Sequence, residues 1–247
     1  MKGKRVQLVG HTMGTPGYDL EEAAGLFRAC GFSGMETVCR EGAAVEPFAD
    51  TAALAQAARR LADRGVRWMT LTPYAWDLES ADPKRGAAAR ELLEWAVDAC
   101  AAAGGAYVRA YSGREPAPKD REDAWKRAVE RLWRVSERAR KCGVMLVVEN
   151  HHGTLTRTGE DTRAFVEAVG SPTAGILYDP ANVLCDTDEP WERTFDIQKE
   201  RIAYVHVKDF RRESDRRKAC PAGAGCVPWR SILQALCPQR LRGMLFV

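Results

Sequence analysis

The stretch DAWKRAVERLWRVSERARKCGVMLVVEN, residues 123–150, joins two patterns at a glycine. Residues 123–143 are amphipathic and rich in Ala, Leu and Arg, and we expect them to form a helix. Gly143 ends that pattern, because glycine readily adopts the left-handed conformation that terminates many helices. Residues 144–150 follow as a short apolar run, which is typical of a buried strand. The stretch therefore predicts one helix–strand unit of an α/β protein.

This alternation extends along the whole chain. Eight strand-like runs lie at residues 5–11, 34–38, 66–74, 106–113, 144–150, 175–182, 202–209 and 243–247. Seven helical stretches separate them, the clearest at residues 19–31, 50–65, 87–105 and 123–143. Strands that alternate with helices predict a parallel sheet with right-handed crossovers.

Eight parallel strands in 247 residues fit a (β/α)8 TIM barrel. The rival open sheet normally carries a G-x-G-x-x-G turn after its first strand, and GHTMGTPGYD at residues 10–19 lacks that spacing. The sequence contains no linker or composition break, so we expect one domain over residues 1–247. We also expect the final helix to be missing, because the eighth strand-like run is the last segment of the sequence.

Composition excludes several classes of protein. Hydrophobic residues make up 45% of the chain, which is enough for a sizeable core, and the net charge of +3 is too small to indicate nucleic-acid binding. The sequence has no apolar run long enough to predict a membrane span and no signal-peptide pattern at its start, so we expect a cytoplasmic protein. The eight cysteines are then expected to be reduced.

Side chains that can bind metal stand at the ends of three consecutive expected strands. Glu149 ends the fifth, Asp179 the sixth and His206 the seventh, at separations of 30 and 27 residues. Each residue alone has an ordinary interpretation as a helix cap, a turn residue or a core histidine. In a barrel, however, the carboxyl ends of neighbouring strands lie side by side, so the set predicts a metal site. Mixed oxygen and nitrogen ligands suit Mn, Fe, Co or Zn better than Ca.

Six segments together resemble one known family. They read GFSGMET, AYVRAYSG, VVENHHGTLTRT, GILYDPAN, YVHVKDFRR and PAGAGCVPW. With them the chain resembles the xylose isomerase-like TIM-barrel superfamily, in its sugar phosphate isomerase/epimerase branch.

The resemblance implies an enzyme of carbohydrate metabolism that moves a proton next to a carbonyl of a sugar, sugar phosphate or cyclitol. It implies a divalent metal, which could be Mn, Co, Fe, Zn or Mg, held by Glu149, Asp179 and His206, with Glu149 also catalytic. It implies substrate contacts or supporting roles for Arg109, His152, Asn182, Lys208 and Arg212. At the strand ends, His11, Tyr74 and Trp76 could also line the pocket, although packing at the rim explains them equally well.

Two features depart from the family pattern. Tagatose-epimerase-type members carry an acidic residue six positions after the strand-five glutamate, where this sequence has Leu155. The family's fourth ligand, a strand-eight glutamate, would fall one position after Val247. We therefore expect weak metal occupancy and low activity from this chain.

Three alternatives stay open. A metal-dependent dehydratase of the inosose or dehydroshikimate type would use the same site, and a truncated barrel or a subunit of a larger complex would need a partner. A DNA-repair relative of the endonuclease IV type is disfavoured, because four histidines are too few for its multi-metal cluster and the basic segment 211–218 also carries acidic residues. We expect a small-molecule carbohydrate as partner and no nucleic acid or membrane. A homodimer is one way to cover the apolar edge beside the last strand.

Overall fold

The computed structural model describes residues 7–213 and 216–236. Seven parallel strands form one sheet in the order in which they occur along the chain. They are β1 (Val9–His11), β2 (Gly34–Cys39), β3 (Arg67–Pro73), β4 (Tyr107–Ala110), β5 (Met145–Glu149), β6 (Ala174–Tyr178) and β7 (Ile202–Val205). The sheet curls in the manner of a TIM barrel, so that β7 faces β2 across the interior and the Tyr204 hydroxyl on β7 donates a hydrogen bond to Glu36 on β2. The predicted parallel α/β architecture is confirmed.

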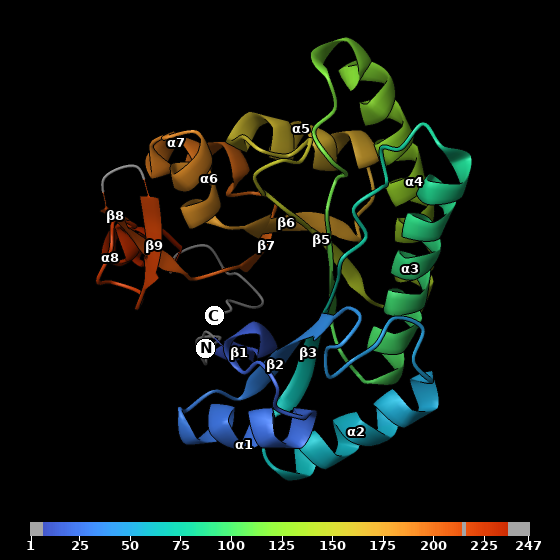
Figure 1. Ribbon diagram of the computed structural model, residues 1–247, viewed down its shortest axis with the longest axis vertical. Helices are drawn as coiled ribbons and strands as arrows, with labels where there is room; N and C mark the ends of the chain where they lie inside the picture. The colour runs from blue at the N-terminus through green and yellow to red at the C-terminus, as the bar shows by residue number, and fades with distance from the viewer. Residues whose placement is uncertain (1–6, 214–215, 237–247) are drawn as a thin grey trace, which may run out of the picture.

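Helices follow the strands and lie outside the curled sheet (Figure 1). They are α1 (Leu20–Ala29), α2 (Thr51–Asp63), α3 (Pro83–Ala102), α4 (Arg121–Cys142), α5 (Gly159–Val169), α6 (Pro180–Asp186), α7 (Trp191–Gln198) and α8 (Trp229–Leu236), with short 3-10 turns at Thr12–Gly14 and Pro118–Asp120. Among the described residues, no helix is long and apolar enough to cross a membrane.

Local signals explain where these helices begin and end. Asp19 starts α1 with a capping box, in which its carboxylate accepts hydrogen bonds from the backbone of Glu21 and Glu22. Gly143 ends α4 in the left-handed conformation, with φ of 69°, and β5 begins two residues later. The opening stretch of sequence is therefore a helix–glycine–strand unit, as predicted.

An apolar layer fills the inside of the curled sheet. It consists of Val9, Met69, Tyr107, Val147, Leu177 and Tyr204, one residue from each of six strands. On the remaining strand, β2, a Cβ on Gly34 would lie 2.7 Å from side-chain atoms of both Met69 and Val9, so only glycine fits there. This layer forms the floor on which the carboxyl-end residues of the strands stand.

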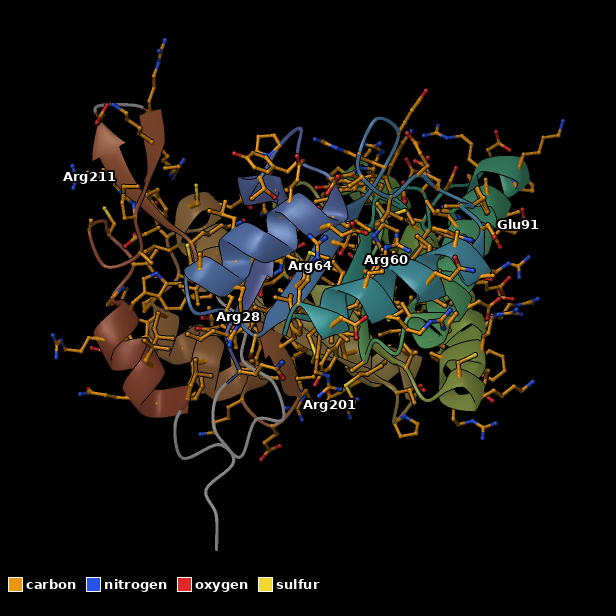
Figure 2. All side chains as sticks on the ribbon, turned by 90° about the horizontal axis from the view of Figure 1, so that it is seen from below. Arg28, Arg60, Arg64, Glu91, Arg201 and Arg211 are labelled. Atoms are coloured by element: carbon orange, nitrogen blue, oxygen red, sulfur yellow. The ribbon has the colours of Figure 1, made fainter. Side chains whose placement is uncertain are left out.

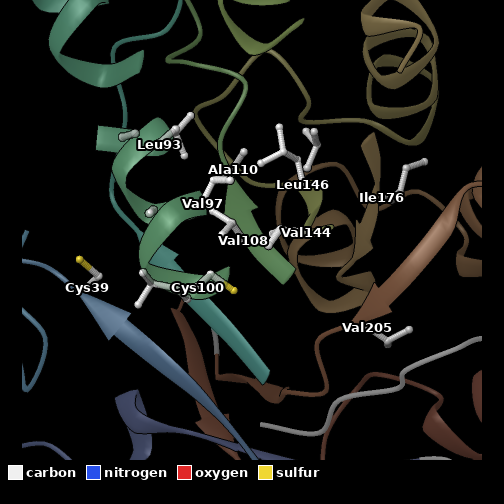
Figure 3. Packing of buried hydrophobic residues seen from close by; sticks show 14 of the residues in the cluster. Cys39, Leu93, Val97, Cys100, Val108, Ala110, Val144, Leu146, Ile176 and Val205 are labelled. Atoms are coloured by element: carbon white, nitrogen blue, oxygen red, sulfur yellow. The ribbon is translucent and has the colours of Figure 1, made fainter. Parts of the chain in front are cut away.

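The larger core lies between the sheet and the helices. Figure 3 shows Leu93, Val97 and Cys100 of α3 facing Val108 and Ala110 of β4, and all five are buried. Successive strand residues therefore point alternately to the inner floor and to this outer core, as Tyr107 and Val108 do.

Several predicted segments differ from the structure. The run 106–113 is a strand only over Tyr107–Ala110. The run 175–182 is a strand only to Tyr178, and Pro180 then begins α6, because Asp179 caps that helix and proline suits its first position. The run 202–209 is a strand only to Val205. Residues 211–213 and 216–218, part of the basic segment for which no strand was predicted, lie in an antiparallel hairpin of β8 (Asp209–Glu213) and β9 (Arg216–Cys220). Figure 2 shows this hairpin standing out from the body of the protein beside Arg211.

Three expectations are not tested by the fold. The eighth strand-like run, 243–247, lies outside the described residues, and so does the expected absence of a helix after it. A single domain over residues 1–247 stays a prediction.

The end of α4 generates a stability prediction. Gly143→Ala should lower the free energy of unfolding by about 1 kcal/mol, because the Cβ of alanine makes the left-handed conformation sterically unfavourable. Gly25→Ala is the matched control, since a Cβ at either position meets nothing within 4 Å and Gly25 lies inside α1. The control should gain about 0.5–1 kcal/mol from helix propensity. Urea unfolding measures both, and changes of the same sign would contradict the assignment.

Candidate metal and catalytic site

A polar layer stands directly above the apolar floor. Its members are His11, Glu36, Arg109, Glu149, Asp179 and His206, each two residues after a floor position on its strand. Because inward-facing side chains recur every two residues along a strand, floor and polar layer are successive levels of one interior. All six polar residues are buried.

Glu149, Asp179 and His206 converge as the sequence predicts. Nδ1 of His206 lies 3.5 Å from a carboxylate oxygen of Glu149 and 3.8 Å from Oδ2 of Asp179. One oxygen from each acid and one ring nitrogen lie within 4.8 Å of one another. Such a spacing would let the three side chains ligate one ion.

Asp179 uses its two oxygens differently, one as a helix cap and the other in an ion pair. Its Oδ1 accepts a hydrogen bond from the backbone N–H of Asn182 at 2.9 Å. Its Oδ2 lies 2.8 Å from Nζ of Lys208, but no donor in the described part of the chain is aligned for a hydrogen bond with this buried atom. Burial opposes ionisation, yet the charge of Lys208 and the contact with His206 lower the pKa of Asp179.

Glu149 is held from two sides. Nη1 of Arg109 donates to one carboxylate oxygen at 3.0 Å, and the Asn182 side-chain amide donates to the other at 3.1 Å. Burial alone would raise the pKa of Glu149, but the hydrogen bond with His206 and the charge of Arg109 lower it well below its usual range. Glu149 is therefore a fixed, ionised carboxylate.

Lys208 belongs to the same network. Its ammonium donates to Oδ1 of Asn182 at 2.6 Å, so the side-chain amide of Asn182 connects Lys208 to Glu149. The backbone beyond it is fixed by Asp209, whose carboxylate accepts hydrogen bonds from four backbone N–H groups, those of Phe210, Gly223, Gly225 and Val227. The structure thus brings Arg109, Asn182 and Lys208 to the predicted site.

Two predicted substrate contacts lie elsewhere. His152 is exposed, and its ring stacks on that of His151 with centroids 4.1 Å apart. Arg212 lies on β8 and pairs with Asp188, and both side chains are exposed. Leu155, where some family members carry an acid, is fully buried in the outer core.

Aromatic side chains form one wall beside Glu149. Trp76 stacks on Tyr111 with centroids 3.9 Å apart, and His151 meets the edges of both rings. The guanidinium of Arg109 lies 3.7 Å from the centre of the Tyr111 ring and 4.7 Å from that of Tyr74. Tyr74 and Trp76 therefore lie close to the site, in agreement with the expectation that they could line the pocket.

Glu36 belongs to the segment GFSGMET that supports the family resemblance, but reasoning from sequence gave it no role in the site. Its fully buried carboxylate accepts hydrogen bonds from Thr72 at 2.6 Å and Tyr204 at 2.5 Å, and meets Nε2 of His206 at 3.2 Å and Nε2 of His11 at 3.3 Å. Burial opposes ionisation, but His206 and His11 hold the pKa of Glu36 well below its usual range. The sequence feature that could have identified it is its position two residues after Gly34. The other residues of the polar layer likewise lie two residues after a residue of the apolar floor.

A cavity of about 630 Å³ lies near the ends of β1 and β2, and none of the six residues of the polar layer lines it. Thr12 and Val38, which line it, follow His11 and Glu36 closely along the chain. Tyr18 and Arg40 also line it. Its size is within the range of small-molecule sites.

Comparisons with known proteins bear on the fold and family of the chain. A family model described as xylose isomerase-like TIM barrel matches residues 8–247. An inosose dehydratase of Lacticaseibacillus casei is 26% identical over 96 residues, which cover 39% of this chain and 32% of that protein. The matched stretch therefore spans about a third of that relative.

Solved structures resemble nearly the whole chain. A structure of L-ribulose 3-epimerase matches with a TM-score of 0.79 at 21% identity, and the match covers 98% of this chain and 80% of the epimerase chain. A structure of IOLI protein with a bound zinc atom has a TM-score of 0.80 at 17% identity, covering 98% and 88%. At these identities the likeness shows the fold.

The buried ion pair generates a second prediction. Arg109→Met should lower the free energy of unfolding by about 3–5 kcal/mol, because it leaves Glu149 buried without its cation. Arg138→Met is the matched control, since Arg138 pairs with Asp98 on the surface and should cost less than about 1 kcal/mol. Urea unfolding at neutral pH measures both variants. Equal losses in the free energy of unfolding would show that the buried charge of Glu149 does not need Arg109 as its partner.

His206 generates a third prediction, for the metal-free protein. Burial disfavours its charged form, but the carboxylates of Glu36, Asp179 and Glu149 raise its pKa well above 6.5. A raised folded-state pKa stabilises the protein fully below the unfolded value, and that stability is lost as pH rises through the folded value. Urea unfolding from about pH 6 to about pH 9 should therefore show wild type losing stability relative to His206→Gln. A constant difference between the two would contradict this.

Proposed function

Because the chain belongs to the xylose isomerase-like TIM barrel family, we propose that it is a divalent-metal-dependent isomerase or epimerase. Its substrate would be a sugar, sugar phosphate or cyclitol, and its reaction a proton transfer next to a carbonyl. The observation that carries this proposal is the convergence of Glu149, Asp179 and His206 in one buried group.

The donor set fits a divalent ion. Two carboxylates and one imidazole, whose donor atoms lie within 4.8 Å of one another, suit Mn, Co, Fe, Zn or Mg. Glu149, Asp179 and His206 would hold the ion. When bound, it would supply a positive charge that stabilises negative charge developing on the substrate oxygen.

Glu149 would accept and return the proton. Arg109 and Asn182 fix both of its oxygens, so the carboxylate is oriented before the substrate arrives. Its lowered pKa keeps it ionised but also makes it a weak base. Removal of a proton therefore depends on a substrate made more acidic by the positive charge nearby.

Substrate binding would use the side chains around this base. Lys208, half exposed at 46%, and Arg109 place positive charge near the oxygens of a substrate. The Trp76–Tyr111 stack offers a flat apolar face to the carbon skeleton of a sugar ring. His152 and Arg212 stay predictions as substrate contacts that would require movement of their side chains.

A dehydratase is the second candidate. The curated relative in Lacticaseibacillus casei is an inosose dehydratase, and the same proton removal followed by loss of water would give that reaction. We also retain as proposals a cytoplasmic location, a homodimer, a single domain and the absence of nucleic-acid and membrane partners.

Metal binding gives the fourth prediction. Asp179→Asn should lower the affinity for Zn²⁺ or Mn²⁺ at least about tenfold in calorimetric titration of chelator-treated protein, because it removes a charged ligand. Asp19→Asn is the matched control, since both aspartates cap a helix and asparagine preserves a cap. Equal affinities in the two variants would place the ion elsewhere.

A substrate panel tests the activity. Keto-sugars, their phosphates and 2-keto-inositols should be assayed after EDTA treatment and again after Mn²⁺ is added. Metal-dependent formation of an isomer supports the isomerase or epimerase, and metal-dependent loss of water supports the dehydratase. If no substrate turns over with any metal, both candidates are wrong.

A further inference from the structure

His206 presents its two ring nitrogens to different groups. Nδ1 faces the proposed ligands Glu149 and Asp179, at 3.5 and 3.8 Å. Nε2 faces Glu36, whose two carboxylate oxygens both lie 3.2 Å away. The ring therefore bridges the proposed metal ligands on one side and a buried carboxylate on the other.

The surroundings of Glu36 keep it an acceptor. Thr72 and Tyr204 both donate hydroxyl hydrogen bonds to it, from β3 and β7. An ionised carboxylate has no proton to donate, so a histidine nitrogen that bonds to it must carry the hydrogen. In the neutral ring, which is the form that binds a metal, Nε2 of His206 is therefore the N–H side, and the lone pair is left to Nδ1.

His11 supports this arrangement and does not compete for the ion. Its Nδ1 accepts the backbone N–H of Met13 at 2.9 Å, so in the neutral ring Nε2 carries the hydrogen and points it at Glu36, 3.3 Å away. Both nitrogens of His11 are thus in use. His11, Glu36 and His206 lie close enough to suggest a second metal group, but the hydrogen bonds make them a positioning network.

We propose that Glu36 is a positioning residue that fixes the ring of His206, with Nε2–H on Glu36 and Nδ1 as the metal-binding atom. The proposal rests on the metal site of the proposed function. Carboxylates that accept the second N–H of a ligating histidine fix its orientation and strengthen it as a ligand. Glu36 would do this from β2, across the interior from the strands that hold the ion.

A spectrum of the unaltered protein tests the assignment first. Long-range ¹H–¹⁵N correlation of the histidine rings in the Zn²⁺-loaded protein should show His206 with a protonated Nε2 and with the metal on Nδ1. Metal on Nε2 would overturn the inference and leave the proposed function intact. Failure of the protein to bind Zn²⁺ at all would remove the proposed function itself.

Substitution then tests the dependence on Glu36. Glu36→Gln should weaken Zn²⁺ binding about 10–100-fold in calorimetric titration, as loss of such a partner typically does. Glu79→Gln is the matched control, because it makes the same change at another carboxylate with a buried oxygen, and its affinity should stay unchanged. Tyr204→Phe keeps the carboxylate but removes one of its donors, and should weaken binding less than Glu36→Gln. Wild-type affinity in folded Glu36→Gln would overturn the proposal.

Discussion

The two-residue repeat of side chains along a strand is the constraint on which this site depends. Once the parallel sheet curls, every second residue points inward, and the inward residues of neighbouring strands form levels. Val147 and Leu177 lie in the apolar level, and Glu149 and Asp179 stand one step above them. The floor excludes water from below, so the charges above it interact strongly.

Buried charged side chains in the polar layer need partners of opposite charge, and acidic and basic side chains are present there in similar numbers. Glu36, Glu149 and Asp179 are the acids, while Arg109, His206 and Lys208 are the bases that face them. Burial of such pairs is costly and gives little net stability compared with an apolar core. A cluster of this kind, with several perturbed pKa values in one buried place, is typical of a functional site.

Part of this could be predicted from sequence because it depends on neighbouring strands. Glu149, Asp179 and His206 end consecutive strands, so their adjacency follows from one helix–strand unit each. Glu36 and His206 are 170 residues apart, and only the curl of the sheet brings them into contact. The hairpin of β8 and β9 was missed because charged side chains on both of its faces hide the alternation that identifies strands. His152 was chosen over His151 although the two are adjacent, since sequence does not tell which ring turns toward Trp76.

The most direct measurement is the anomalous diffraction of a crystal of the protein soaked with Zn²⁺, recorded at the zinc absorption edge. The account predicts a peak at about 2.0–2.2 Å from oxygens of Glu149 and Asp179 and from Nδ1 of His206. A peak bound to other side chains, or coordinated through Nε2 of His206 with Glu36 as a ligand, would contradict it.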